Sequence, residues 1–309
     1  HGVIVKRLSA IPEFGSIDIL CTDKTGTLTE GKITLVKYLD VMGQESDSVL
    51  HYAYMNSFMQ TGLRNPLDDA ILNFRHLSVR DYHKLQEIPY DFYRKRISVV
   101  VNHNARHELV TKGQPEEILK IATHYMEGEK PHRIDEIFLQ KFSRIYQNLS
   151  ESGFKTLAVA NKVFSDKKHA YGKNDEKGLT MLGLVGFYDP PKHTAAETIK
   201  MLCHNGLEVK IITGDNELVT KKTCDDIGLS VKGIMVGDEL AQMSDETLAI
   251  KAEENTIFAR FSPEQKRRVI VALRSRQHVV GYLGDGINDA PSLKAAAIGI
   301  TVSTEADVA

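Results

Sequence analysis

Short apolar runs alternate with helical segments through the last part of the chain, and this alternation constrains the fold more than any other feature. Strands are expected at residues 181–187, 209–212, 257–260 and 279–283, and helices at 193–203, 217–227, 263–275 and 290–297. Connecting helices allow successive strands to lie parallel in one sheet that is covered on both faces. The pattern predicts an α/β fold with a doubly wound parallel sheet of Rossmann type.

The middle of the chain has a different pattern. Helices are expected at 46–60, 66–72, 115–126 and 134–149, strands at 84–89, 97–102, 108–111 and 154–164, and a polar surface loop at 165–177. A turn at 103–106 joins two of these strands in antiparallel fashion. We therefore expect a core domain made of residues 1–36 and 178–309, with an α+β domain inserted at 37–177.

One more strand of the core sheet is expected at residues 17–21, and Asp23 follows it directly. Open α/β sheets bind their ligands at the carboxyl ends of their strands. A carboxylate at such a position, beside Lys24 and the backbone N–H groups of a loop containing Gly26, can attack phosphorus and form an aspartyl phosphate.

Polar loops also follow two other expected strands. Thr213, Gly214 and Asp215 come after the strand at 209–212, and a hydroxyl beside a glycine N–H can hold phosphoryl oxygens. The segment 284–289 follows the strand at 279–283, and its paired carboxylates, Asp285 and Asp289, suit a hard cation such as Mg²⁺. Lys266, on the helix at 263–275, can neutralise charge on a transferring phosphoryl group.

Four motifs in this order resemble those of P-type ion-pumping ATPases: DKTGTLT at 23–29, DPPK at 189–192, TGDN at 213–216 and GDGINDAPSLKAA at 284–296. The resemblance covers nearly the whole chain and implies a haloacid-dehalogenase-like core. It implies that Asp23 is phosphorylated and that Asp23, Asp285, Asp289 and the Thr25 carbonyl surround Mg²⁺. The implied phosphoryl site is lined by Lys24, Thr25, Thr213, Gly214, Asp215, Lys266, Asn288 and Asp289.

The middle block resembles the nucleotide-binding domain of the same pumps. Residues 112–116, KGQPE, are similar to the family's KGAPE. The resemblance implies that ATP contacts Asp68 near the adenine amino group, Tyr90 on the adenine ring, Lys112 and Gly113 at its edge, and Lys95 and Lys155 near the phosphates. Two departures stand out, since Gln114 replaces a small Ala and Ala297 replaces an Asp.

The stretches 5–8, 14–21, 60–65 and 88–92 look most like bacterial magnesium-transporting P-type ATPases. The full-length protein is then expected at the cytoplasmic face of the cell membrane, with its own actuator domain and transmembrane helices as partners. This chain has neither the actuator's TGE[ST] motif nor a run of the ~18–20 apolar residues that a membrane helix needs. We expect it to be soluble, to bind Mg²⁺ and ATP, and not to transport ions.

Two other classes of function stay open. A soluble phosphatase of the haloacid-dehalogenase type would use the same nucleophile, but such enzymes have an Asp as acid/base two residues later, where this chain has Thr25. A nonenzymatic nucleotide sensor would bind ATP without forming a phosphoenzyme. The formal net charge of -2 gives no reason to expect a nucleic acid partner. Three widely spaced cysteines indicate free thiols in a reducing compartment.

Overall fold

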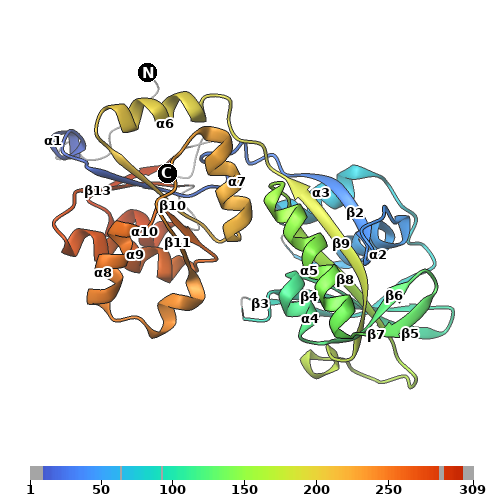
Figure 1. The fold of residues 1–309 in the computed structure, drawn as a ribbon. Coiled ribbons are helices and arrows are strands. Elements are labelled where there is room, and N and C mark those ends of the chain that lie inside the picture. Colours follow the sequence, from blue (N-terminus) through green and yellow to red (C-terminus); the bar gives the residue numbers. More distant parts are fainter. Residues whose placement is uncertain (1–9, 63–64, 92, 285–288, 302–309) are drawn as a thin grey trace. The chain divides into compact units, whose positions relative to one another are not determined.

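The fold is that of a computed structural model, which describes residues 10–62, 65–91, 93–284 and 289–301. The chain divides into two compact units (Figure 1). One unit contains the described residues up to Lys32 and those from Asp189 onward, and the other is Ile33–Tyr188. Within the described ranges, no helix combines the length and the apolar character needed to cross a lipid bilayer.

A six-stranded parallel sheet forms the centre of the first unit. Its strands, in spatial order, are β11 (Ile234–Val236), β12 (Ile257–Ala259), β10 (Glu208–Ile212), β1 (Ile19–Thr22), β13 (Val280–Gly284) and β14 (Ile298–Thr301). The helices are α1 (Ala10–Phe14), α6 (Ala195–His204), α7 (Glu217–Ile227), α8 (Asp245–Glu254), α9 (Pro263–Ser275) and α10 (Ala290–Ala295), with a 3₁₀ helix η2 (Gly237–Gln242).

Helices cover both faces of this sheet, as Figure 1 shows. One apolar cluster joins α6 and α7 to the sheet, and another joins α8, α9 and α10 to the opposite face. Successive residues of a strand point to opposite faces, so Ile211 packs in the first cluster and Ile212 in the second. The predicted α/β fold with a parallel sheet is confirmed, and β1 lies inside the sheet with β10 and β13 as its neighbours.

The second unit contains an eight-stranded mixed sheet. Its strands are β3 (His83–Asp91), β4 (Arg96–His103), β5 (Arg106–Gly113), β8 (Lys155–Val163), β9 (Leu179–Tyr188), β6 (Ala122–Glu127) and β7 (Lys130–Arg133) in spatial order, with β2 (Thr34–Asp40) paired to β9. Helices α2 (Asp47–Met59) and α3 (Pro66–Phe74) pack on one face, and α4 (Pro115–Leu119) and α5 (Glu136–Glu151) pack on the other. A 3₁₀ helix η1 (Lys173–Asp175) precedes β9.

Three expectations about secondary structure were wrong. The helix expected at 115–126 ends at Leu119, because the residues that follow form β6, which pairs with β7 and β9. The strand expected at 181–187 is β9, which belongs to the mixed sheet and not to the parallel sheet. The segment 165–177 is not wholly a surface loop, since it buries Tyr171 and Glu176.

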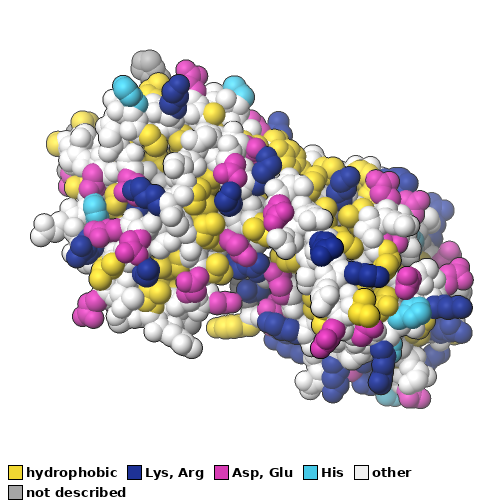
Figure 2. Space-filling view, viewed as in Figure 1, with side chains coloured by type: hydrophobic (Ala, Val, Ile, Leu, Met, Phe, Trp, Pro, Cys, Tyr) yellow, Lys and Arg dark blue, Asp and Glu magenta, His cyan; other side chains and the backbone are white. Residues whose placement is uncertain are grey.

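Lysine and arginine side chains are intermixed with aspartate and glutamate over the surface seen in Figure 2. This distribution agrees with the small net charge of the sequence, -2. The surface charge thus indicates no site, and the candidate sites described next contain buried charged groups.

Candidate functional site

Asp23 lies at the carboxyl end of β1, between the ends of β10 and β13. Its backbone N–H donates to the Leu283 carbonyl at 3.0 Å, which extends the pairing of β1 with β13 by one residue. The Lys24 N–H donates to Asp23 Oδ1 at 2.7 Å. The strand register therefore fixes the Asp23 carboxylate at the edge of the sheet where parallel α/β folds bind ligands.

Lys266 joins two carboxylates in this place. Its Nζ lies 2.9 Å from Asp23 Oδ2 and 2.9 Å from Asp289 Oδ1, and all three side chains are buried. Burial raises the pKa of Asp23, while the Lys266 charge opposes that rise. Burial alone would lower the pKa of Lys266, but the two carboxylates raise it, so the lysine stays charged. A fixed cation beside a nucleophilic carboxylate can stabilise charge on a transferring phosphoryl group.

A second buried ion pair links the β1 loop to the β10 loop. Lys24 Nζ lies 2.6 Å from Asp215 Oδ2, and the Thr25 hydroxyl donates to the same oxygen at 3.4 Å. The Asp215 N–H donates to Thr213 Oγ1 at 3.2 Å. A Cβ added to Gly214 would meet only the Phe261 carbonyl, at 3.7 Å, so crowding does not demand glycine there. The structure thus brings together most of the predicted phosphoryl-site residues.

Asp289 fits a metal ion through its second carboxylate oxygen. Among the described residues, Oδ2 of Asp289 has no hydrogen-bond partner although it is buried. A Cβ added to Gly284 would lie 2.4 Å from this oxygen, so glycine is required to leave room for it. Burial raises the pKa of the Tyr282 hydroxyl, and the negative charges of Asp23 and Asp289 raise it further.

Asp285 and Asn288, two of the predicted site residues, lie outside the described residues. Within the described part of the chain, no group of three or more His, Cys, Asp or Glu side chains is arranged to hold a metal ion. Of the predicted magnesium ligands, Asp23, Asp289 and the Thr25 carbonyl belong to the described part of the chain.

Sequence reasoning gave Asp189 no role beyond its motif, but the structure gives it one. Its carboxylate accepts hydrogen bonds from the Thr29 hydroxyl at 2.6 Å and from the Gly31 N–H at 2.9 Å. Lys192 Nζ donates to the Gly26 carbonyl at 2.9 Å. The segment after β9 therefore holds the loop that follows Asp23 in place.

In the second unit, Asp68 and Lys112 form a buried ion pair. The Lys112 ammonium also bonds the Ser57 hydroxyl, and Asp68 Oδ1 accepts from Ser57 at 2.7 Å and from Gln60 Nε2 at 3.1 Å. Burial lowers the pKa of Lys112, and the Asp68 carboxylate opposes that shift. Asp68 Oδ2 is buried with no hydrogen-bond partner in the described part of the chain, which is an unfavourable state for a carboxylate oxygen.

Gly113 lies against the start of β4. A Cβ there would be 2.5 Å from Arg96 Cβ and 2.7 Å from the Lys95 carbonyl. The Gln114 N–H donates to the same carbonyl at 3.0 Å, and Lys95 has a φ of 49°. Packing between strands therefore demands glycine at position 113, a reason that the sequence resemblance did not supply.

Tyr90, near the end of β3, is 49% exposed. Burial raises the pKa of its hydroxyl, and the charge of Lys155, at the start of β8, opposes that rise. A half-exposed aromatic ring can stack on a base, and a lysine charge that acts on it can attract an anion. Among the predicted nucleotide residues, the structure pairs Asp68 with Lys112 and packs Gly113 against Lys95.

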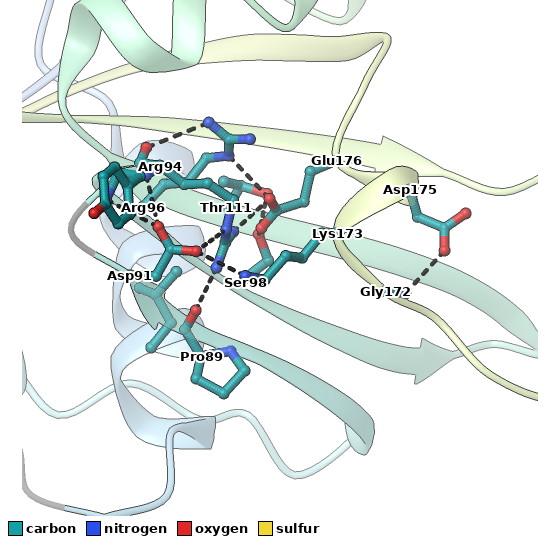
Figure 3. Close-up of polar contacts among 12 residues, drawn as sticks. Pro89, Asp91, Arg94, Arg96, Ser98, Thr111, Gly172, Lys173, Asp175 and Glu176 are labelled. Carbon is teal, nitrogen blue, oxygen red and sulfur yellow. Dashed lines mark hydrogen bonds and ion pairs between the residues drawn. The ribbon is translucent and has the colours of Figure 1, made fainter.

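Glu176 is a buried residue that sequence reasoning missed. Its carboxylate accepts hydrogen bonds from Ser98, Arg94 and Arg96 (Figure 3). The glutamate lies about 80 positions away in the sequence from these partners, and the only signal was its place in a polar stretch just before a strand.

Comparisons with known proteins give a consistent result. A family described as "P-type ATPase, cytoplasmic domain N" matches residues 11–194. The chain is 45% identical over 314 residues to "Magnesium-transporting ATPase, P-type 1" of Escherichia coli K12, an alignment that covers 99% of this chain and 35% of that protein. The protein of the same name from Salmonella typhimurium is 44% identical, with the same coverage.

A more distant relative is "Calcium-transporting ATPase 1" of Lactococcus lactis, which is 31% identical over 330 residues, covering 99% of this chain and 38% of the relative. The chain spans about a third of the length of the curated relatives it matches.

Proposed function

Because this chain belongs to the P-type ATPase family, we propose that it is the part of an ATP-driven cation pump that binds ATP with Mg²⁺ and accepts the γ-phosphate on Asp23. The single observation that carries the proposal is the Asp23 carboxylate, fixed at the carboxyl end of β1 and held by Lys266 at 2.9 Å. The names of the relatives at 44% and 45% identity favour magnesium as the transported ion.

The two units take different parts in this proposal. The unit with the parallel sheet is the phosphorylation domain, with a haloacid-dehalogenase-like fold. The unit Ile33–Tyr188 is a nucleotide-binding domain inserted into it. This assignment is supported by the motif loops at the carboxyl ends of β1 and β10, and by the Asp68 oxygen in the other unit that receives no hydrogen bond from the described residues.

The reaction proposed is an in-line displacement at phosphorus. An Asp23 carboxylate oxygen forms a bond to the γ-phosphorus as the bond to the bridging oxygen breaks, and ADP leaves with that electron pair. Lys266 and Lys24 compensate the negative charge, and the Thr213 hydroxyl with the Gly214 N–H bonds the phosphoryl oxygens. Asp23 and Asp289, together with Asp285 and the Thr25 carbonyl, would hold Mg²⁺, which when bound neutralises phosphate charge.

We assign ATP to the second unit because its side chains complement the chemical groups of the nucleotide. Asp68 Oδ2, which receives no hydrogen bond from the described residues, accepts one from the adenine amino group, and Tyr90 stacks on the adenine ring. Lys112 keeps Asp68 in position, and Gly113 forms the edge of the adenine site. Lys95 and Lys155 complete the set of side chains that we assign to ATP and its phosphates.

The whole protein is proposed to include an actuator domain and transmembrane helices, with this chain at the cytoplasmic face of the membrane. The relatives are about three times as long as the alignment, which supports further domains in them. This chain alone is expected to carry out the partial reactions of nucleotide binding and phosphorylation.

The test is transfer of label from γ-³²P-ATP in the presence of Mg²⁺, followed by hydroxylamine treatment. We expect hydroxylamine-sensitive label that is absent from Asp23→Asn and retained in Asp225→Asn, an exposed aspartate paired with Lys221. Label that persists in Asp23→Asn would refute the assignment of the nucleophile. Rapid hydrolysis of p-nitrophenyl phosphate without stable label would favour a phosphatase of the haloacid-dehalogenase type.

A further inference from the structure

The Glu176 carboxylate is a buried anchor for the turn between β3 and β4. Its Oε2 accepts from Arg94 Nη1 at 2.5 Å and from Arg96 Nε at 3.0 Å, and its Oε1 accepts from the Ser98 hydroxyl at 2.7 Å. The Glu176 side chain is fully buried, whereas the two arginine side chains are 13% and 11% exposed. Figure 3 shows the three donors converging on this one carboxylate.

Arg94 connects Glu176 to the residues on both sides of Tyr90. Its Nη2 donates to the Pro89 carbonyl at 2.5 Å, and its Nε donates to Asp91 Oδ2 at 2.8 Å. Asp91 also accepts from the Arg94 N–H at 2.7 Å, which closes the turn on itself. Since Pro89 and Asp91 are the residues on either side of Tyr90, the guanidinium fixes the backbone that carries the ring.

Arg96 connects Glu176 to Gly113. The backbone of Arg96 pairs with Gly113 across β4 and β5 and leaves no space for a Cβ there. The Lys95 carbonyl, one residue earlier, accepts from the Gln114 N–H. One carboxylate therefore holds, through two arginines, the two chain segments to which we assigned the nucleotide's base.

The charges of Arg94 and Arg96 are both paired with Glu176. Arg94 has a second carboxylate partner in Asp91, but the other described hydrogen bond of the Arg96 side chain goes to the Arg94 carbonyl, at 3.3 Å. Loss of the Glu176 charge would leave the Arg96 guanidinium buried without a described carboxylate partner, which favours its movement toward water. The turn would then lose the constraint that sets the position of Tyr90.

We propose that Glu176 is a positioning residue for the nucleotide site, acting through Arg94 and Arg96 on Tyr90 and Gly113. This inference rests on the proposed ATP binding by the Ile33–Tyr188 unit. Glu176 touches no nucleotide itself. It fixes the turn before the ligand arrives, so it lowers the ordering cost of binding.

The test compares two adjacent carboxylates of one loop. Glu176→Gln removes the charge that faces the turn, whereas Asp175→Asn removes one whose partners, Lys168 and the Gly172 N–H, lie within the loop itself. ATP affinity is measured calorimetrically on the full chain without Mg²⁺, with the thermal unfolding of each variant recorded. We expect Glu176→Gln to weaken ATP binding about tenfold, as for partial loss of a base–aromatic stack, and Asp175→Asn to leave it unchanged.

A double-variant cycle separates positioning from general destabilisation. In a Tyr90→Ala background, Glu176→Gln should have little further effect on ATP affinity, because the ring that it positions is gone. Equal losses with and without Tyr90 would overturn the proposal, and so would unchanged affinity in Glu176→Gln.

Arg94→Lys gives a second test if Glu176→Gln does not fold. It keeps the charge but replaces the three separate nitrogens that bond Asp91, Glu176 and Pro89 by a single one, and it should also weaken ATP binding. ATP affinity in Arg94→Lys equal to that of the wild type would overturn the proposal. If the wild-type chain binds no ATP, the proposed function itself fails. If the wild-type chain binds ATP and the Glu176→Gln and Arg94→Lys variants bind it with the same affinity, the proposed function stands and this inference alone fails.

Discussion

Replacing Lys112 by Met should destabilise the Ile33–Tyr188 unit by about 3 kcal/mol, because it leaves the Asp68 carboxylate buried without its cation. The side chains of the pair are 2% and 0% exposed. Breaking a buried pair by removing one partner costs ~3–5 kcal/mol. The Ser57 hydroxyl and the Gln60 amide still donate to Asp68 Oδ1, at 2.7 and 3.1 Å, which places the loss near the lower end of that range.

A second substitution should return much of the lost stability. Asp68→Asn in the Lys112→Met background removes the uncompensated charge and keeps an oxygen that can accept from Ser57. We expect the double variant to regain about 2 kcal/mol, because an uncharged amide is far less costly to bury than a lone carboxylate. Lys120→Met serves as the matched control, since Lys120 is 67% exposed in its pair with Glu117 and should contribute less than ~1 kcal/mol.

The assay is urea unfolding at pH 7 with circular dichroism, together with hydrogen exchange of amides in the Ile33–Tyr188 unit. Hydrogen exchange is needed because two compact units need not unfold in one transition. The reasoning is refuted if Lys112→Met costs no more than Lys120→Met. It is also refuted if the Asp68→Asn double variant is no more stable than Lys112→Met alone.

Three further changes test other parts of the structure. Burial lowers the pKa of His278, but the carboxylates of Asp18 and Glu253 outweigh burial and raise it above its usual value near 6.5. The contribution of the charged imidazole to stability is therefore full below about pH 6.5 and is lost as pH rises through the raised pKa. The stability advantage of the wild type over His278→Gln, measured by urea unfolding, should shrink as pH is raised above about 6.5. Gly113→Ala should cost ~1–3 kcal/mol because its Cβ meets Arg96, whereas Gly172→Ala, with no atom within 4 Å, should change stability by less than ~0.5 kcal/mol; equal unfolding midpoints would contradict this. A thiol reagent should label only the exposed Cys203 in the native chain, since the other two thiols are buried with pKa values raised to about 12; mass spectrometry that finds three labels before unfolding would show that they are accessible.

Much of the first unit could be predicted because its signals are local. Helices α7 and α9 have the predicted bounds, since their caps are in the sequence: Asn216 accepts from the Val219 N–H, and Ser262 forms a capping box ahead of Pro263. Parallel strands bring their carboxyl ends to one edge, so loops far apart in sequence could be expected together. The bond between Asp23 and Lys266 follows from that arrangement.

The second unit was harder to predict because its features depend on distant partners. Residues 122–127 fit a helical pattern but form β6, which is stabilised by pairing with β7 and β9. Glu176 looked like one charge in a polar loop, yet its burial depends on two arginines about 80 positions earlier. A one-dimensional pattern cannot show that a charge will be neutralised by residues so far away.

The candidate sites of the two units share one arrangement of side chains. In each, a buried lysine bonds one oxygen of a carboxylate and leaves the other oxygen buried without a hydrogen bond from the described residues: Lys266 with Asp289, and Lys112 with Asp68. An unsatisfied buried acceptor costs ~1–3 kcal/mol, so such an oxygen is unfavourable unless a ligand uses it. The lysine orients the carboxylate, and in our proposal the second oxygen meets a cation in one unit and the adenine amino group in the other. If the proposed ligands bind these two oxygens, binding would restore the stability lost there, and this is the physical argument for assigning function to these two carboxylates.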